Sequence, residues 1–299
     1  MESSQFSNSQ NGFETIEQLD TQGATCDAFR VKMYGKLHFL KRLRPEYVGD
    51  IRYQEALRKE FETGYRLEHP NLVRYISLDA DSILMDYVDG ETLSQRLAAH
   101  PVYFKNRKNT DRFVRQLLDA ISYLHSHQVL HLDLKPDNIL LTRINDDVKL
   151  IDLGFCYTDA FEDTMGHTNA YAAPEQLSTV NGKLSTKTDI YAIGKILEQL
   201  PYHYIYNKVI ARCTFEQPED RYQSVEEILH DINRRKRFSR YVAAFVAIVA
   251  ALVVCLVFIT HHQESSPVKQ EAQTDSVALS EVNLGDRSRD SVHQNPGLK

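Results

Sequence analysis

The segment His131-Leu132-Asp133-Leu134-Lys135-Pro136-Asp137-Asn138 decides the interpretation of the rest of this chain. It places a carboxylate, an ammonium group and a carboxamide at short intervals, and the apolar run Ile139-Leu140-Leu141 follows at once. Further along, Lys149-Leu150-Ile151-Asp152-Leu153-Gly154 is a second apolar run that ends in an acid. The pattern predicts a loop held between two buried strands, with the polar side chains gathered at one site.

The residue types in these two runs suit the transfer of a phosphoryl group. Asp133 can accept the proton of an acceptor hydroxyl, and Lys135 can neutralise charge on the moving group. Asn138 and Asp152 offer the oxygen ligands that hard cations prefer. We therefore expect Asp133 and Lys135 to be catalytic and Asn138 and Asp152 to bind a metal ion.

Length and composition narrow the class of protein. The chain has 299 residues, of which 42% are hydrophobic and 10% aromatic, enough for one or two globular domains. Its formal net charge of −6 argues against nucleic acid as a partner. The 4 cysteines are scattered without a C-x-x-C pair, so we expect neither a zinc site nor a disulfide framework. The polar start of the chain predicts no signal peptide.

The C-terminal part has a different character. The basic run 234–240 precedes residues 241–260, which carry no charge. A helix of that length rises about 30 Å, enough to cross a bilayer. Because positive flanks stay in the cytoplasm, the preceding domain is expected inside and the tail 261–299 outside. We also expect both 1–12 and the polar tail to be disordered.

Several motifs in order resemble those of one family. The first segment resembles the protein-kinase catalytic loop H-R-D-L-K-P-x-N, and Asp152-Leu153-Gly154 resembles D-F-G. Ala173-Pro174-Glu175 matches A-P-E, and Thr188 to Gly194 resembles the start of the large-lobe central helix. The chain thus resembles eukaryotic-type Ser/Thr protein kinases of the bacterial membrane-anchored kind over residues 13–233.

The resemblance implies a fold class and a ligand set. The expected fold is α+β and bilobal, with a small β-rich lobe, a larger helical lobe and one C-terminal transmembrane helix. The expected cofactors are ATP and magnesium. The resemblance gives ATP-binding roles to Lys41, Glu60, Gly23, Asp86, Val88, Asn138 and Asp152. Glu60 would orient Lys41, Met85 would guard the back of the adenine site, and Asp86 and Val88 would offer backbone groups to adenine.

The same resemblance implies supporting contacts. Asp189 is expected to brace the catalytic loop, and Arg221 is expected to pair with Glu175. Thr168 and Lys135 favour Ser/Thr over Tyr as the acceptor. The short spacing between Asp189 and Arg221 predicts that one large-lobe helix is missing.

The chain departs from the family at the nucleotide lid. Thr21 and Cys26 occupy two glycine positions of the family's G-x-G-x-x-G loop, and only Gly23 is retained. We therefore expect a looser or differently shaped lid. Phe39 stands where the family has a small alanine under the adenine ring, and both departures argue against tight ATP binding. Leu132 replaces an arginine that would contact an activation-segment phosphate, so we expect activity without that phosphate.

Periodicity predicts the main elements. We expect a hairpin around Tyr34-Gly35, helices over 51–67, 93–99 and 111–125, and a short strand at Val129-Leu130. His125, His127 and His131 lack the spacing of a zinc site.

Two alternatives to a membrane-anchored Ser/Thr protein kinase stay open. One is a pseudokinase scaffold that binds partners without turnover, which Thr21, Cys26 and Phe39 favour. The other is a small-molecule kinase, which the missing helix favours. The expected partners are a protein with Ser or Thr acceptors and a bacterial inner membrane contacted through Tyr241–Thr260. A homodimer is a further candidate.

Overall fold

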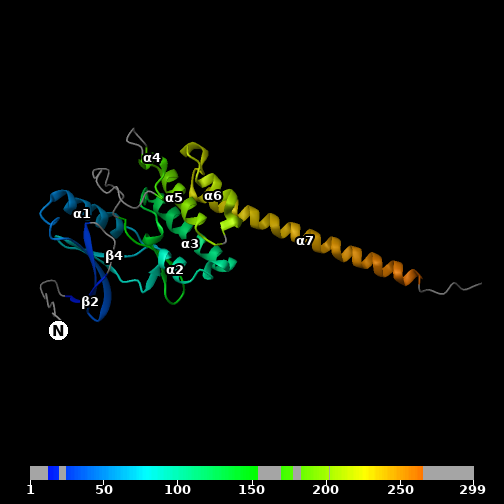
Figure 1. Cartoon of the computed structure of the whole chain (residues 1–299), viewed down its shortest axis with the longest axis horizontal. Helices are drawn as coiled ribbons and strands as arrows, with labels where there is room; N and C mark the ends of the chain where they lie inside the picture. Colours follow the sequence, from blue (N-terminus) through cyan, green and yellow to red (C-terminus); the bar gives the residue numbers. More distant parts are fainter. Residues whose placement is uncertain (1–12, 20–24, 154–169, 178–182, 202, 265–299) are drawn as a thin grey trace, which may run out of the picture. The chain divides into compact units, whose positions relative to one another are not determined.

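The structure of this protein is a computed structural model that describes residues 13–19, 25–153, 170–177, 183–201 and 203–264. It divides into two compact units, Met1–Tyr241 and Val242–Lys299. The first unit has two parts: a strand-rich lobe that includes α1 and a helical lobe that includes α2 to α6 (Figure 1). The predicted bilobal α+β fold is confirmed.

The small lobe is a five-stranded antiparallel sheet in the order β1-β2-β3-β5-β4. Its strands are β1 (Glu14–Leu19), β2 (Cys26–Met33), β3 (Lys36–Leu43), β4 (Tyr75–Leu78) and β5 (Ser82–Asp86). The predicted hairpin joins β2 to β3. Its turn residues Tyr34 and Gly35 both have positive φ, 48° and 80°, which matches the twist of a tight two-residue hairpin.

One helix belongs to the small lobe. Helix α1 (Ile51–Tyr65) begins after Asp50, whose side chain accepts a hydrogen bond from the Arg52 amide. Its buried residues are Leu57, Glu60 and Gly64, so the charged helix turns one acidic residue inward. That inward position sets up the candidate site.

The large lobe combines a small sheet with helices. Strands β6 (Gly90–Thr92), β7 (Ile139–Thr142) and β8 (Val148–Leu150) form an antiparallel sheet. The helices are α2 (Leu93–Ala99), α3 (Arg107–Ser126), α4 (Pro174–Leu177), α5 (Thr186–Glu198) and α6 (Asn207–Cys213). The described residues between α5 and α6 contain only a short 3-10 helix, His203–Tyr206, as the close spacing of Asp189 and Arg221 predicts.

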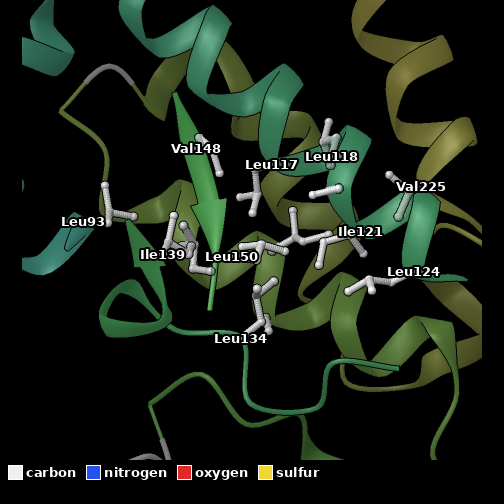
Figure 2. Close-up of a cluster of buried hydrophobic side chains, with 14 of the residues drawn as sticks. Leu93, Leu117, Leu118, Ile121, Leu124, Leu134, Ile139, Val148, Leu150 and Val225 are labelled. Carbon is white, nitrogen blue, oxygen red and sulfur yellow. The ribbon is translucent and has the colours of Figure 1, made fainter. Parts of the chain in front are cut away.

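Helix α3 provides the centre of the core. Its apolar face packs against β7, β8 and the catalytic segment, and Figure 2 shows Leu117, Ile121 and Leu124 beside Leu134 and Leu150. These side chains are all at most 1% exposed. The catalytic segment is therefore anchored in the driest part of the lobe.

Backbone hydrogen bonds join the two lobes directly. The Val73 amide donates to the Leu150 carbonyl at 2.9 Å, and the Leu150 amide donates to the Asn71 carbonyl at 2.8 Å. The Asn71 side chain also donates to the Val148 carbonyl. This contact fixes the start of β4 against the end of β8, immediately before Asp152.

The predicted strand at Val129-Leu130 is wrong. The Val129 amide donates to the Leu124 carbonyl, so the segment closes the C-terminal end of α3. Gln128 has a φ of 61°, the left-handed conformation that often ends a helix. Two apolar residues were not enough to form a strand here, because the Val129 amide bonds to the end of α3.

The last helix, α7 (Val225–Glu264), contains a segment that could span a membrane. Tyr241–Ile259 is long and apolar enough for this by length and composition. It nearly coincides with the predicted span 241–260. In the first unit, α7 packs through the buried residues Val225, Ile228 and Ile232.

Candidate active site

Three charged side chains from three parts of the chain meet below the small-lobe sheet. Lys41 on β3 donates to both carboxylate oxygens of Glu60 on α1, at 3.0 Å and 2.8 Å. It also donates to Oδ1 of Asp152, which follows β8, at 2.9 Å. The structure therefore brings Lys41, Glu60 and Asp152 together, as the sequence predicts.

This cluster lies in a dry environment. The Glu60 side chain is 4% exposed, whereas Lys41 is 18% and Asp152 34% exposed. Burial raises the pKa of Glu60, and the neighbouring ammonium of Lys41 opposes that rise. Burial alone would lower the pKa of Lys41, but Asp152 and Glu60 outweigh it and raise that pKa, so Lys41 stays charged. Lys41 is therefore a fixed cation beside the more exposed carboxylate of Asp152.

A buried tyrosine completes the cluster, and sequence reasoning missed it. Tyr75 on β4 donates its hydroxyl to Oε1 of Glu60 at 3.1 Å. The same hydroxyl accepts the backbone N–H of Leu153 at 3.2 Å. The one available signal was Gly64, a helix-weakening residue placed one turn after Glu60 on α1.

The catalytic segment forms a second cluster. Lys135 Nζ lies 2.8 Å from Oδ2 of Asp133. The Asn138 side-chain amide donates both to Oδ2 and to the backbone carbonyl of Asp133, at 2.9 Å each. Residues 136–138 form a single 3-10 turn, which brings Asn138 back toward Asp133. The predicted catalytic pair and the carboxamide therefore contact one another.

Asp189 braces this segment from the N-terminus of α5, as predicted. Its carboxylate accepts the backbone amides of His131 and Leu132 at 2.9 Å and 2.8 Å, and it contacts Nε2 of His125 at 2.8 Å. Asp189 is fully buried; burial would raise its pKa, but the hydrogen bonds and His125 outweigh burial and lower it. The brace is needed because Leu132 has a φ of 61°, a strained conformation for a leucine.

Gln176 is a second residue that the motifs did not reveal. Its amide nitrogen donates to the Leu132 carbonyl at 2.8 Å, and its amide oxygen accepts from the Ala173 backbone at 3.0 Å. The strained residue Leu132 is thus held on both sides, by Asp189 on its N–H and by Gln176 on its carbonyl.

The predicted pair of Glu175 and Arg221 is present. The guanidinium donates to both oxygens of the carboxylate, at 2.8 Å and 2.9 Å, and Arg221 is fully buried. Thr188 donates to the same carboxylate at 3.0 Å. The pair ties α4 to α5 and to the segment that follows α6.

The segment between the lobes carries the residues expected near adenine. Met85 is buried and lies opposite Phe39 in the β3–β5 register. Asp86 ends β5; its backbone amide donates to the Arg74 carbonyl, and its carboxylate accepts from Lys36 at 2.7 Å. Val88 packs against the core from a half-buried position.

Some predicted positions lie outside the described residues. These are Thr21 and Gly23 of the nucleotide lid, Gly154, and the threonines at 158, 164 and 168. Cys26 is described: it begins β2, is 9% exposed, and burial raises the pKa of its thiol. Among the described residues no group of three or more His, Cys, Asp or Glu side chains is arranged to hold a metal ion.

The sequence model of the protein kinase domain matches residues 20–252 of this chain. The chain belongs to the protein kinase family. This assignment agrees with the geometry, because Lys41 contacts Glu60 and Asp152, and Asp133 contacts Lys135 and Asn138.

Curated relatives of this protein kinase include bacterial Ser/Thr kinases. It is 34% identical over 173 residues to the serine/threonine-protein kinase PrkC of Bacillus subtilis, a match covering 54% of this chain and 26% of the relative. It is 33% identical over 204 residues to the serine/threonine-protein kinase pkn3 of Myxococcus xanthus, covering 62% and 37% respectively. The match therefore spans about a quarter to about a third of these relatives' length.

Solved kinase structures share the fold. The kinase domain of Mycobacterium tuberculosis PknI aligns with a TM-score of 0.55 at 22% identity, covering 75% of this chain and 96% of that domain. The apo form of PpkA-294 aligns with a TM-score of 0.61 at 20% identity, covering 74% and 95%. At this identity the likeness establishes the fold of the kinase domain.

Proposed function

We propose that this chain is a membrane-anchored Ser/Thr protein kinase that transfers the γ-phosphoryl group of ATP to protein hydroxyls. The observation that carries the proposal is the presence of two clusters: Lys41 bound to Glu60 and Asp152, and Asp133 bound to Lys135 and Asn138. The first supplies a fixed cation and a metal carboxylate, and the second supplies a base with an adjacent ammonium group.

The donor set fits magnesium. The nitrogen of the Asn138 amide donates to Asp133, so its oxygen is directed away from that carboxylate. The Asp152 carboxylate is 34% exposed and contacts Lys41. Magnesium prefers such oxygen ligands and commonly takes one or two carboxylates plus phosphate oxygens. With one carboxylate and one carboxamide here, the remaining ligands would come from the nucleotide and water.

Each side chain then has a stated task. Lys41 binds the nucleotide phosphates, and Glu60 keeps its ammonium group in place. Asp133 orients the acceptor hydroxyl and takes its proton, while Lys135 offsets negative charge on the phosphoryl group. Bound magnesium would supply neutralisation of the phosphate charge. Asp86 and Val88 are proposed to present backbone groups to adenine, and Gly23 to cover the phosphates.

A protein hydroxyl is the acceptor that the comparisons support. The relatives PrkC and pkn3 carry the description of serine/threonine-protein kinases. Lys135 in the catalytic segment is the residue type expected for Ser/Thr acceptors. A small-molecule acceptor is less well supported, because the A-P-E glutamate is present and paired with Arg221.

Membrane anchoring rests on α7. Tyr241–Ile259 has the length and composition of a span, and the basic residues of 234–240 precede it. The positive flank supports a cytoplasmic kinase domain and an outer tail, in the inner membrane of a bacterium. The tail was expected to be disordered from residue 261, but residues 261–264 are the end of α7; residues 265–299 and 1–12 lie outside the described residues.

A pseudokinase scaffold is the less favoured alternative. It predicts loss of a catalytic group, yet all four are retained: Lys41 contacts Asp152, and Asn138 contacts Asp133. The test is transfer of labelled phosphate from ATP, with magnesium, by the purified full-length chain to itself and to a generic protein substrate. Transfer to Ser or Thr supports the kinase. If MgATP binds but no phosphate is transferred with any metal or substrate tried, the pseudokinase scaffold becomes the preferred function.

A further inference from the structure

Tyr75 occupies an unusual place for a large polar side chain. It lies on β4 at the back of the candidate site and is 2% exposed. Its hydroxyl uses both of its hydrogen-bonding capacities, as donor to Glu60 and as acceptor from the Leu153 amide. One atom therefore connects α1, β4 and the segment that carries Asp152.

Gly64 makes room for that ring. It lies on α1 one turn after Glu60, and both residues are buried on the inner face of the helix. A Cβ placed on Gly64 would come within 2.4 Å of Cδ2 and Cε2 of Tyr75, a separation that real atoms do not tolerate. A glycine inside a helix costs about 1 kcal/mol relative to alanine. The stability that α1 loses through Gly64 must therefore be offset by a benefit from the Tyr75 ring that the glycine accommodates.

The hydroxyl sits in a strongly charged environment. Glu60 already accepts two hydrogen bonds from Lys41, and Tyr75 adds another. Burial raises the pKa of Tyr75 well above its usual range, and the negative charges of Glu60 and Asp152 act in the same direction. The phenol consequently keeps its proton and remains a hydrogen-bond donor to Glu60.

The other partner of the hydroxyl is the peptide after a strained residue. Asp152 has a φ of 64°, which few residues other than glycine adopt without cost. The next amide, that of Leu153, donates to Tyr75 at 3.2 Å. Holding this amide fixes the direction of the strained backbone, and with it the carboxylate that contacts Lys41.

We propose that Tyr75 is a positioning residue whose hydroxyl couples the placement of Glu60 to that of Asp152. A displacement of α1 would break the hydrogen bond from the Tyr75 hydroxyl to Glu60. A rearrangement of the segment that carries Asp152 would break the hydrogen bond from the Leu153 amide to the same hydroxyl. Each contact therefore favours the other, and the site is complete only when both are made. The role in nucleotide binding rests on the proposed function, whereas the coupling itself does not.

Tyr75→Phe tests the hydroxyl without emptying the space that its ring fills. In the full-length protein we expect hydrogen exchange of the Leu153 amide, measured without nucleotide, to become about tenfold faster or more, because its acceptor is gone. We expect the dissociation constant of MgATP and the magnesium concentration for half-maximal binding to rise about fivefold to tenfold. Tyr34→Phe is the matched control, since Tyr34 is 97% exposed, and it should change neither.

Gly64→Ala tests whether the Tyr75 ring needs the space beside Gly64. Its new methyl group must displace the Tyr75 ring, so we expect faster Leu153 exchange, weaker MgATP binding and lower thermal stability. The double variant Gly64→Ala with Tyr75→Leu removes the clash. It should regain thermal stability relative to Gly64→Ala alone, but not tight MgATP binding, because no hydroxyl is present.

The outcomes separate coupling from packing. Unchanged Leu153 exchange and MgATP affinity in Tyr75→Phe would overturn the proposal, and so would wild-type MgATP affinity in the double variant. If the wild-type chain binds no MgATP but Tyr75→Phe still accelerates Leu153 exchange, the proposed function fails while the coupling stands. If MgATP binds and only its affinity, not the exchange, responds to Tyr75→Phe, the coupling through Leu153 is contradicted.

Discussion

The side-chain amide of Gln176 donates a 2.8 Å hydrogen bond to the backbone carbonyl of Leu132, and so joins α4 to the catalytic segment. Leu132 has positive φ, and its own N–H is held by Asp189. The two contacts hold the peptide groups on either side of the strained residue Leu132, directly before Asp133. A neutral glutamine therefore makes a contact between the A-P-E region and the catalytic segment without any phosphate.

Gln176→Ala should impair turnover more than binding. A side-chain hydrogen bond of this kind contributes about 1 kcal/mol, so we expect kcat to fall roughly fivefold and the KM for ATP to stay within about twofold. Asn109→Ala is the matched control, because it removes a similar bond from a side-chain amide to the Tyr103 carbonyl. Steady-state kinetics of both variants check this. A change in KM alone would contradict the positioning role of Gln176.

Activity should not depend on phosphorylation of the activation segment. Leu132 has no charge and no side-chain donor, so a phosphate would find no partner there. We expect the double variant Thr158→Ala with Thr164→Ala, at positions outside the described residues, to keep its rate within about fivefold. The protein should be produced and assayed with and without phosphatase treatment. A hundredfold loss with the fold retained would show that a phosphate is required.

Glu175→Gln should destabilise the kinase domain. Arg221 is fully buried, and its guanidinium also donates to the backbone carbonyls of Phe215, Lys187 and Glu216. Removing the carboxylate leaves a buried positive charge uncompensated, which costs about 3 kcal/mol. Urea unfolding of the full-length chain in detergent micelles at neutral pH measures this. A change below about 1 kcal/mol would mean that the backbone carbonyls suffice for Arg221.

The same pair gives a pH dependence with a definite sign. Burial alone would raise the pKa of Glu175, but the hydrogen bonds and charge of Arg221 outweigh it and hold that pKa below the usual 4.5. The pair therefore stabilises the fold fully above pH 4.5, and this stabilisation is lost as the pH falls through the folded-state pKa. The stability difference between wild type and Glu175→Gln should shrink on acidification below that value. A difference that grows in acid would contradict this.

The sequence predicted contacts that lie within linear motifs. Lys41 with Glu60, Asp189 with the catalytic segment, and Glu175 with Arg221 were each implied by the resemblance of their motifs to those of protein kinases. Periodicity located α1, α2 and α3 because their buried faces repeat every three to four residues.

Other features could not be predicted because they depend on tertiary contacts. Tyr75 and Gln176 act through partners far away in sequence, and no motif marks either residue. Val129 is β-branched, yet its amide closes α3 instead of joining a sheet. The strand propensity of Val129 was overridden there by its hydrogen bond to the end of α3.

The membrane topology can be tested by protease access. We expect protease added to spheroplasts to remove only the tail after the apolar segment of α7, because the basic flank stays inside. The flank consists of Arg234, Arg235, Lys236, Arg237 and Arg240. Permeabilised cells serve as the control, in which the kinase domain should also be digested. Digestion of the kinase domain in intact spheroplasts would contradict the orientation.

The central claim is tested most directly by comparing Asp133→Asn with Asp152→Ala in the same full-length protein, measuring both MgATP binding and phosphate transfer. Asp133 is proposed as the base, and a carboxamide lacks its basicity, so Asp133→Asn should keep the fold and MgATP binding. Its transfer rate should drop on the order of a hundredfold to ten-thousandfold. Asp152→Ala should lose both, because the metal carboxylate is gone. Transfer by Asp133→Asn at the wild-type rate would contradict the catalytic assignment.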